Sequence, residues 1–149
     1  MHSLRNELLN SDFANEFQAI NSNHLDGLAH LRQAELHIVT ARAIESGDYE
    51  LILQTSYDAA RKSLQAVLAC IGLKVKSPPG NHWTFIKLSR NSIFESESWA
   101  DLKWLRERRN DAEYFTIESP AISMNEAFQA LEAACAMIAD ARRLVQGFH

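Results

Sequence analysis

The longest regular hydrophobic pattern lies in residues 49–71, and it restricts the fold more than any other feature of the chain. Apolar and small side chains recur there every three or four residues, which is the spacing of one helix face. They are Ile52, Leu53, Ser56, Ala60, Ser63, Leu64, Val67, Leu68 and Ile71. Asp48 is a suitable N-cap and Gly72 a suitable C-terminal stop. Because this stripe is wide and rich in small residues, we expect other helices to pack closely against it.

A second regular pattern covers residues 123–145, and Ser123 and Glu126 have the spacing of a capping box at its start. We expect these two long helices to pack at the centre of the molecule. The side chains expected to be nearly inaccessible are Leu64, Val67, Leu68, Phe128, Leu131 and Ile138.

Other segments fit shorter or less regular helices. Residues 23–45 have one side covered by Leu25, Leu28, Leu31 or Ala29, Leu36, Val39 and Ala43. Residues 82–88 fit a short helix, residues 98–101 fit the cap of a further helix, and residues 1–20 fit a broken N-terminal helical extension. Because no segment alternates with a strand period, we predict an all-α fold without a β-sheet. It is an antiparallel bundle of four to six helices, in one domain spanning residues 1–149.

The composition of the chain limits its possible functions and cellular locations. The net charge of −4 provides no overall attraction for nucleic acid, so such contact requires a local patch. Cys70 and Cys135 fall within apolar helical patterns, which favours a core role over a disulfide or a metal site and fits a reducing, cytoplasmic setting. The N-terminus lacks the apolar segment of a secretory signal, and no apolar run reaches the ~18 residues of a membrane span.

Arg109 is the most informative single residue. The stripe of Trp99, Leu102 and Leu105 continues with Arg109 at helical spacing, where an apolar residue is expected. A guanidinium is costly to bury without a partner. Arg109 therefore extends along its stem to solvent, pairs with Glu113 or another carboxylate, or lines a cleft or subunit interface.

The surrounding segment forms a local basic patch. Lys103, Arg106, Arg108 and Arg109 supply the positive charges, and Asp101, Glu107, Asp111 and Glu113 dilute them. Such mixed runs are most often solvated helix faces.

Motifs of metal- or nucleotide-dependent enzymes are absent from the sequence: it has no P-loop, dinucleotide fingerprint, Cys-x-x-Cys or His-Glu-x-x-His. His30 and His37 lie seven residues apart, which is not the spacing of helical metal ligands, so we expect neither a metal nor another cofactor. His82 stands at an expected helix start, where the helix dipole lowers the pKa of an imidazole. It is either an accessory acid–base group or a capping residue that packs beside Trp83.

The order of three motifs resembles the HEPN (higher eukaryotes and prokaryotes nucleotide-binding) superfamily. They are the helix containing Tyr57-Asp-Ala-Ala-Arg-Lys-Ser-Leu, the loop reaching Gly80-Asn-His-Trp, and the helix with Leu105-Arg-Glu-Arg-Arg-Asn-Asp-Ala-Glu-Tyr114. The resemblance covers roughly residues 25–145. It implies a bundle of about four helices that often dimerises. Many members are metal-independent RNases and toxins of toxin–antitoxin or abortive-infection systems.

The resemblance also implies a site. The RNase signature of the superfamily is an Arg, a polar residue and then a His after four to six intervening residues. Arg109 and Asn110 match its first two positions, but Tyr114 stands where the His is expected. A Tyr with a pKa near ~10 is a poor base at neutral pH. The match therefore favours phosphate binding, with Arg106 and Arg108 assisting Arg109, over cleavage.

Arg109 and Tyr114 are about 140° apart on a straight helix. They converge only if the helix ends or distorts near Asp111, or if a symmetric dimer brings two copies together.

Two functional hypotheses follow. The first is a homodimeric, HEPN-like protein that binds RNA or nucleotide phosphate through Arg109 and Asn110. It acts as an RNase of weak or lost activity, with Arg109, Asn110 and Tyr114 as the candidate catalytic residues, and has an antitoxin-like partner. The alternative is a non-catalytic interaction module whose arginines form a structural ion-pair network.

Overall fold

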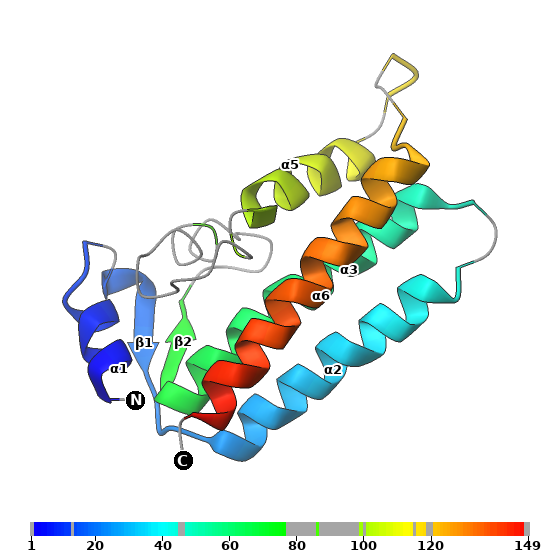
Figure 1. Cartoon of the computed structure of the whole chain (residues 1–149). Coiled ribbons are helices and arrows are strands. Elements are labelled where there is room, and N and C mark those ends of the chain that lie inside the picture. Colours follow the sequence, from blue (N-terminus) through cyan, green and yellow to red (C-terminus); the bar gives the residue numbers. More distant parts are fainter. Residues whose placement is uncertain are drawn as a thin grey trace.

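A computed structural model of the chain describes residues 2–12, 14–44, 47–76, 86, 99, 101–114, 116–118 and 121–147 (Figure 1). Its elements, in chain order, are α1 (His2–Leu9), the 3-10 helix η1 (Ala14–Glu16), β1 (Phe17–Ala19), α2 (His24–Arg42), α3 (Tyr49–Ile71), β2 (Leu73–Val75), α5 (Leu102–Glu113) and α6 (Met124–Gln146). The predicted helical bundle is confirmed. Helix α2 runs antiparallel to α3 and α6, whereas α3 and α6 run parallel, because the segment containing β2 and α5 returns the chain to the end where α3 began (Figure 1).

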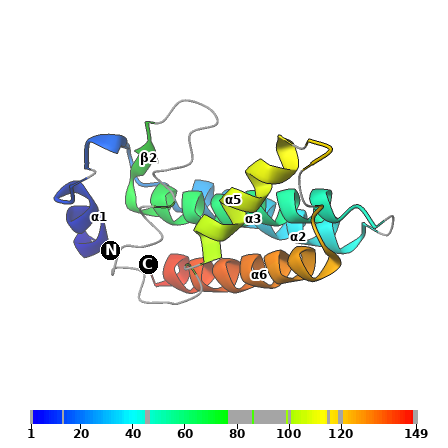
Figure 2. The same cartoon turned by 90° about the horizontal axis from the view of Figure 1, so that it is seen from above.

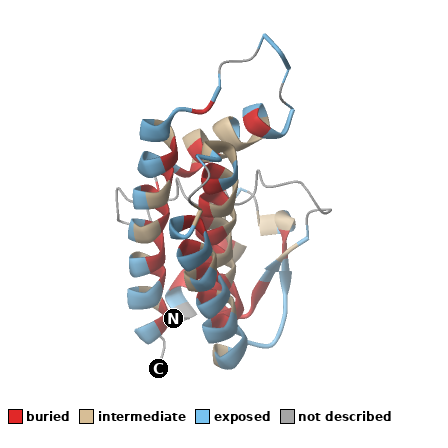
Figure 3. Ribbon diagram, turned by 90° about the vertical axis from the view of Figure 1, so that its right-hand side faces the viewer, coloured by how far each residue is buried: buried red, intermediate tan, exposed pale blue. Residues whose placement is uncertain are grey.

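Helix α3 is the central element. It packs against α2 on one side, α6 on another and α5 on a third (Figure 2). More than half of its residues are buried, so the helix is covered on most of its circumference (Figure 3). Helices that are apolar over most of their surface belong in a core. The expectation that residues 49–71 lie centrally is therefore confirmed.

The caps predicted at Asp48, Ser123 and Gly72 are present, whereas Asp101 at the start of α5 makes no side-chain capping hydrogen bond. The Asp48 side chain accepts a hydrogen bond from the Leu51 N–H at 3.1 Å. The Ser123 hydroxyl accepts one from the Glu126 N–H at 3.1 Å, and the Glu126 carboxylate accepts one from the Ser123 N–H at 3.3 Å. Gly72 ends α3 with a left-handed φ of 79°, a conformation that favours glycine. These bonds satisfy backbone groups that a helix end leaves unpaired.

The prediction of no β-sheet was wrong. Strands β1 and β2 pair antiparallel, with Phe17 opposite Val75 and Ala19 opposite Leu73. The N-terminal extension is accordingly helical only in α1 and the single turn η1. Each strand has three residues, which is too short for a strand-period pattern to be recognised in the sequence.

The apolar side seen in the sequence of residues 23–45 is not the buried side of α2. The buried residues of α2 are Gly27, Leu31, Ala34, Ile38 and Ala41, and of the predicted stripe only Leu31 is among them. Helix α2 carries apolar residues on two opposite faces. The face with Gly27 and two alanines is the one that allows close approach to α3, whereas the sequence pattern favoured the larger leucines on the other face.

Burial elsewhere follows the prediction with two exceptions. Leu64, Val67, Leu68 and Ile138 are buried, as predicted. Phe128 is 51% exposed, and Leu131 is only partly buried. The buried face of α6 is built mainly from alanines, which include Ala127, Ala130, Ala134 and Ala141, so its larger neighbours lie at the edge. Of the expected helix at residues 82–88 only Ile86 is described, and it is helical and buried. The cap residue Ser98 lies outside the described residues.

Replacing Gly27 by alanine tests the close contact of α2 with α3. A Cβ atom at Gly27 would lie 2.2 Å from the Cys70 Sγ and 2.9 Å from the Ala66 carbonyl oxygen. We expect Gly27→Ala to lower the free energy of unfolding by about 1–2 kcal/mol, because overpacking outweighs the better helix propensity of alanine. Gly147→Ala is the matched control, because its Cβ meets nothing closer than 3.4 Å. Urea unfolding measures both, and a stabilised Gly27→Ala variant would contradict the close packing.

Candidate functional site

Helix α5 lies across α3 and brings the predicted arginine segment onto the surface of the bundle (Figure 2). Trp99, Leu102 and Leu105 are buried, and Ala112 continues the same stripe. Arg109 stands between them and is partly buried. The prediction that Arg109 occupies a position of the apolar stripe is therefore confirmed.

The Arg109 guanidinium has one carboxylate partner and one aromatic neighbour. Its Nη1 donates to the Glu113 Oε2 at 2.5 Å, one helical turn away. Its Cζ lies 5.8 Å from the centre of the Tyr57 ring on α3, within the range of a cation–π contact. Its Nε is buried and finds no hydrogen-bond partner among the described residues. The ion pair of Arg109 with Glu113 considered from the sequence is thus present. It satisfies only some of the N–H donors of the Arg109 guanidinium.

Tyr57 is the point on which three arginines converge. Burial raises the pKa of Tyr57 well above its usual range, and the positive charges of Arg61, Arg106 and Arg109 act in the opposite direction. Arg61 lies one turn after Tyr57 on α3, and the other two arginines come from α5. The interface of α3 with α5 therefore brings three arginines near one buried tyrosine, with Asp58 as a nearby negative charge.

Sequence reasoning missed the contribution of α3 to this cluster. Tyr57 was quoted only as the first residue of a family motif, and it is fully buried. Arg61 was quoted within a motif but was not named as a site residue. The available signal was the spacing of four residues between Tyr57 and Arg61, which puts both on one helix face.

Arg108 is placed differently from its neighbours. Its Nε and Nη2 donate to the two carboxylate oxygens of Glu126 on α6, at 2.6 and 3.2 Å, and its Nη1 donates to Asp111 at 2.9 Å. The hydrogen bond from Arg108 holds the pKa of Glu126 below its usual value, and Glu126 raises the pKa of Arg108. Since its donors are engaged by two carboxylates, Arg108 ties α5 to the start of α6.

Tyr114 and Arg109 do not converge within one chain. Helix α5 continues to Glu113 without ending near Asp111, and Tyr114 follows as its C-cap with its side chain 75% exposed. The Asn110 carbonyl accepts the Tyr114 N–H at 2.9 Å, so the backbone remains helical between them. Asn110 is partly buried on the same helix. Of the three catalytic candidates, Arg109 is the one that contacts α3, at the ring of Tyr57.

The remaining candidates offer no further site in the described part of the chain. His82 lies outside the described residues. The described residues contain no group of three or more His, Cys, Asp or Glu side chains arranged to hold a metal ion. Cys70 and Cys135 are unpaired thiols, and burial raises the pKa of Cys70. Among the described helices, none combines the length and hydropathy needed to cross a membrane.

The fold and this interface define a helical bundle protein with a small two-stranded sheet and a cluster of arginines between α3 and α5. A family model described as the HEPN domain matches residues 28–145. The chain therefore belongs to the HEPN family, as its motifs predicted. No curated protein matches the sequence.

Replacing Glu126 by glutamine tests the link between α5 and α6. Because its pKa is lowered in the folded state, the Glu126 carboxylate stabilises the fold at neutral pH and loses this effect as the pH falls through its folded pKa. We expect Glu126→Gln to reduce the free energy of unfolding by about 1–2 kcal/mol at pH 7. The difference from the wild type should shrink towards pH 3. Glu132→Gln, at an exposed position of the same helix, is the control. An equal loss at both pH values would contradict the ionic contribution.

Proposed function

We propose that this HEPN-family chain binds RNA or nucleotide phosphate at the interface of α3 with α5, through Arg109 assisted by Arg106 and Arg61. The observation that carries the proposal is the position of Arg109. Its guanidinium is held over Tyr57 on an otherwise apolar stripe, with its Nε unsatisfied among the described residues. Buried polar groups are nearly always hydrogen-bonded, so an unsatisfied donor requires an explanation. A bound phosphate would explain it, because a phosphate offers several acceptor oxygens to a guanidinium.

Glu113 is a replaceable partner in this proposal. Its side chain is more exposed than that of Arg109, and the pair lies one turn apart on a surface helix. Such pairs contribute only about 0.3–0.5 kcal/mol. A phosphate that accepts two hydrogen bonds from a planar guanidinium therefore displaces the carboxylate at small cost. The Arg108–Glu126 pair is more buried and bidentate, so Arg108 contributes local charge while staying on Glu126.

The proposal assigns weak or absent cleavage to the wild-type protein. Proton transfer requires a group with a pKa near the operating pH, within hydrogen-bond reach of the reacting atom. Tyr114 is a poor base at neutral pH, and its exposed position does not face Arg109 within one chain. The proposal assigns a metal-independent reaction to any RNase activity of this site, as in many members of the family.

We infer that the chain acts in a cytoplasmic toxin–antitoxin or defence system. It acts there as a homodimer to which an antitoxin-like protein binds. The family supports this role, since many HEPN proteins are toxins of such systems. The two unpaired cysteines support a reducing compartment.

A second candidate function is a non-catalytic interaction module. The carboxylate partners of Arg108 and Arg109 favour it, because both pairs are intramolecular and stabilise helix packing. In this case substitution of Arg109 changes stability but not the affinity for RNA. The two functions are therefore separable by one set of variants.

Arg109→Ala should weaken binding of a fluorescent single-stranded RNA about tenfold, the loss of about 1.4 kcal/mol, with unchanged helix content. Arg109→Lys should also lose affinity, because an ammonium cannot make the two-pronged contact. Glu113→Gln should bind as tightly as the wild type or up to about threefold more tightly, because it removes the competing carboxylate.

Lys103→Ala is the matched control, because Lys103 carries the same charge on α5 but pairs with exposed Glu107. Fluorescence anisotropy measures the affinities, and circular dichroism measures the helix content. Equal affinity of the wild type and Arg109→Ala would exclude the phosphate site and favour the interaction module.

Tyr114→His tests whether the missing histidine alone accounts for low activity. Position 114 does not face Arg109 within one chain, so we expect the variant to cleave RNA no more than about twofold faster than the wild type. Added chelator should leave both rates unchanged. The rate of release of a fluorophore from quenched RNA measures cleavage. A large gain in the Tyr114→His variant would mean that position 114 does reach the phosphate held by Arg109.

A further inference from the structure

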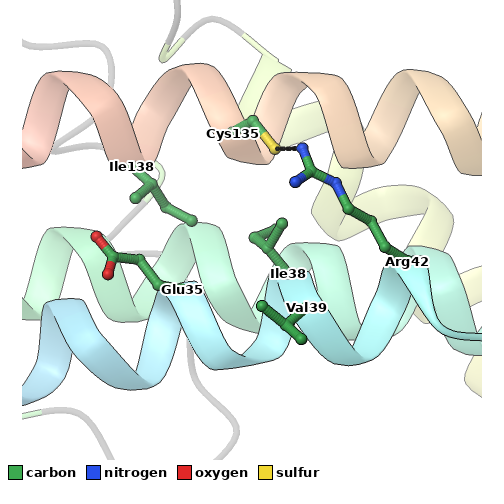
Figure 4. Close-up of a pocket in the computed structure, with 6 residues that line it drawn as sticks. All are labelled: Glu35, Ile38, Val39, Arg42, Cys135 and Ile138. Carbon is green, nitrogen blue, oxygen red and sulfur yellow. Dashed lines mark hydrogen bonds between the residues drawn. The ribbon is translucent and has the colours of Figure 1, made fainter.

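A groove runs between α2 and α6 (Figure 4). It is an open hollow of about 250 Å³ lined by Glu35, Ile38, Val39, Arg42, Cys135 and Ile138. Ile38 and Ile138 form its floor, and both are buried. Val39 forms an edge, with a side chain that is 63% exposed. The middle of the groove is therefore aliphatic and open to solvent on one side.

The two ends of the groove carry its polar side chains. At one end the Glu35 carboxylate is paired with the Arg142 guanidinium of α6. At the other end the Arg42 Nη2 donates to the Cys135 Sγ at 3.4 Å. A thiol sulfur is only a weak acceptor. Among the described residues no carboxylate pairs with Arg42, so this end of the groove presents an unmatched positive charge.

We propose that the groove binds a medium-chain aliphatic monocarboxylate, with its carboxylate on Arg42 and its chain over Ile38 and Ile138. A planar guanidinium and a carboxylate make two parallel hydrogen bonds. The Arg42 side chain leans from the last turn of α2 back towards Cys135, which brings its guanidinium to the end of the groove (Figure 4). There it meets the head of a ligand whose tail lies on the apolar floor.

The distance between the two ends sets the length of the ligand. Arg42 and Glu35 are seven residues apart on α2, which is about 10 Å along the helix axis. With carbon–carbon bonds of about 1.5 Å, an extended chain of about eight carbons covers this distance. The volume is also sufficient, because an apolar cavity of about 150 Å³ already holds benzene. Since the groove is open on one side, we expect a dissociation constant of about 0.1–1 mM for such a ligand.

The floor of the groove distinguishes this site from the proposed phosphate site. A nucleotide or an RNA strand lying on Ile38 and Ile138 would lose hydration without gaining hydrogen bonds, which is costly for polar groups. An aliphatic tail is stabilised by the same burial. In Figure 1, α3 and α6 lie between α2 and α5, so the groove and Arg109 are on different sides of the bundle. This inference therefore goes beyond the phosphate site and does not depend on it.

Octanoate is the probe for the first test, and 1-octanol is the matched ligand without a charge. Isothermal titration calorimetry on the wild-type chain should show one octanoate site. Arg42→Ala should raise the dissociation constant of octanoate about tenfold, because the carboxylate loses its two-pronged contact, and should change that of 1-octanol less than about twofold. Arg32→Ala removes an exposed arginine of the same helix outside the groove, and it should leave octanoate binding unchanged.

Two results of this titration would overturn the proposal. One is equal octanoate affinity of the wild type and Arg42→Ala. The other is a wild type that binds no octanoate at about 10 mM, well above the expected dissociation constant. That second result would leave the groove to an apolar segment of another protein.

Val39→Glu blocks the site without removing Arg42. Position 39 lies one turn before Arg42 on α2, so the new carboxylate reaches the guanidinium and repels the carboxylate of the ligand. Because Val39 is exposed, we expect the variant to fold, and circular dichroism checks this. Octanoate should bind at least about fivefold more weakly. An unchanged affinity in the folded variant would contradict the assigned position of the carboxylate.

The Cys135 thiol reports where octanoate binds. Cys135 is partly exposed in the groove, whereas Cys70 is buried, so iodoacetamide should modify Cys135 first, and Cys135→Ser should lose this fast reaction. Octanoate at about ten times its dissociation constant should slow the reaction by up to about tenfold. In Arg42→Ala the concentration that gives half protection should rise about tenfold. Octanoate that binds the wild type without protecting Cys135 would lie elsewhere on the chain and overturn the proposed site.

Discussion

The close approach of α2 to α3 is the contact on which the rest of the structure depends. It requires Gly27, because any side chain there would meet the Ala66 carbonyl and the Cys70 thiol. Small residues along α3 extend the contact, and Ser56 and Ser63 fit because their hydroxyls bond to carbonyls of their own helix. A core of this kind gains more from many close atomic contacts than from large side chains. It fixes α3 as the platform that presents Tyr57 and Arg61 to α5.

The position of Arg109 follows from this platform. Trp99, Leu102 and Leu105 bury one side of α5, so helical geometry directs the next member of the stripe towards α3 as well. The aliphatic stem packs while the guanidinium reaches Tyr57 and Glu113. A hydrophobic docking interaction thereby holds a cation in a partly desolvated position. An anion is bound more strongly there than at a fully exposed arginine, because screening by water is reduced.

The sequence predicted those features of the fold that depend on neighbouring residues or on helical periodicity. The caps at Asp48, Ser123 and Gly72 depend on neighbouring residues alone, and the stripe through Arg109 depends on periodicity alone. The inner face of α2 could not be predicted, because both of its faces are apolar and the choice depends on which one α3 can approach. The spacing of Arg61 from Tyr57 places both on one face of α3, but their meeting with α5 arises from the crossing of the two helices, which the spacing alone does not give. The pairing of β1 with β2 joins residues far apart in sequence and leaves no periodic signal.

The charge of the whole chain and the arginine cluster act on RNA in opposite directions. The net charge of −4 opposes RNA binding at long range, whereas short-range guanidinium contacts would favour it. Affinity at the proposed site would therefore depend on how α3 and α5 place these guanidinium groups rather than on the field of the whole chain.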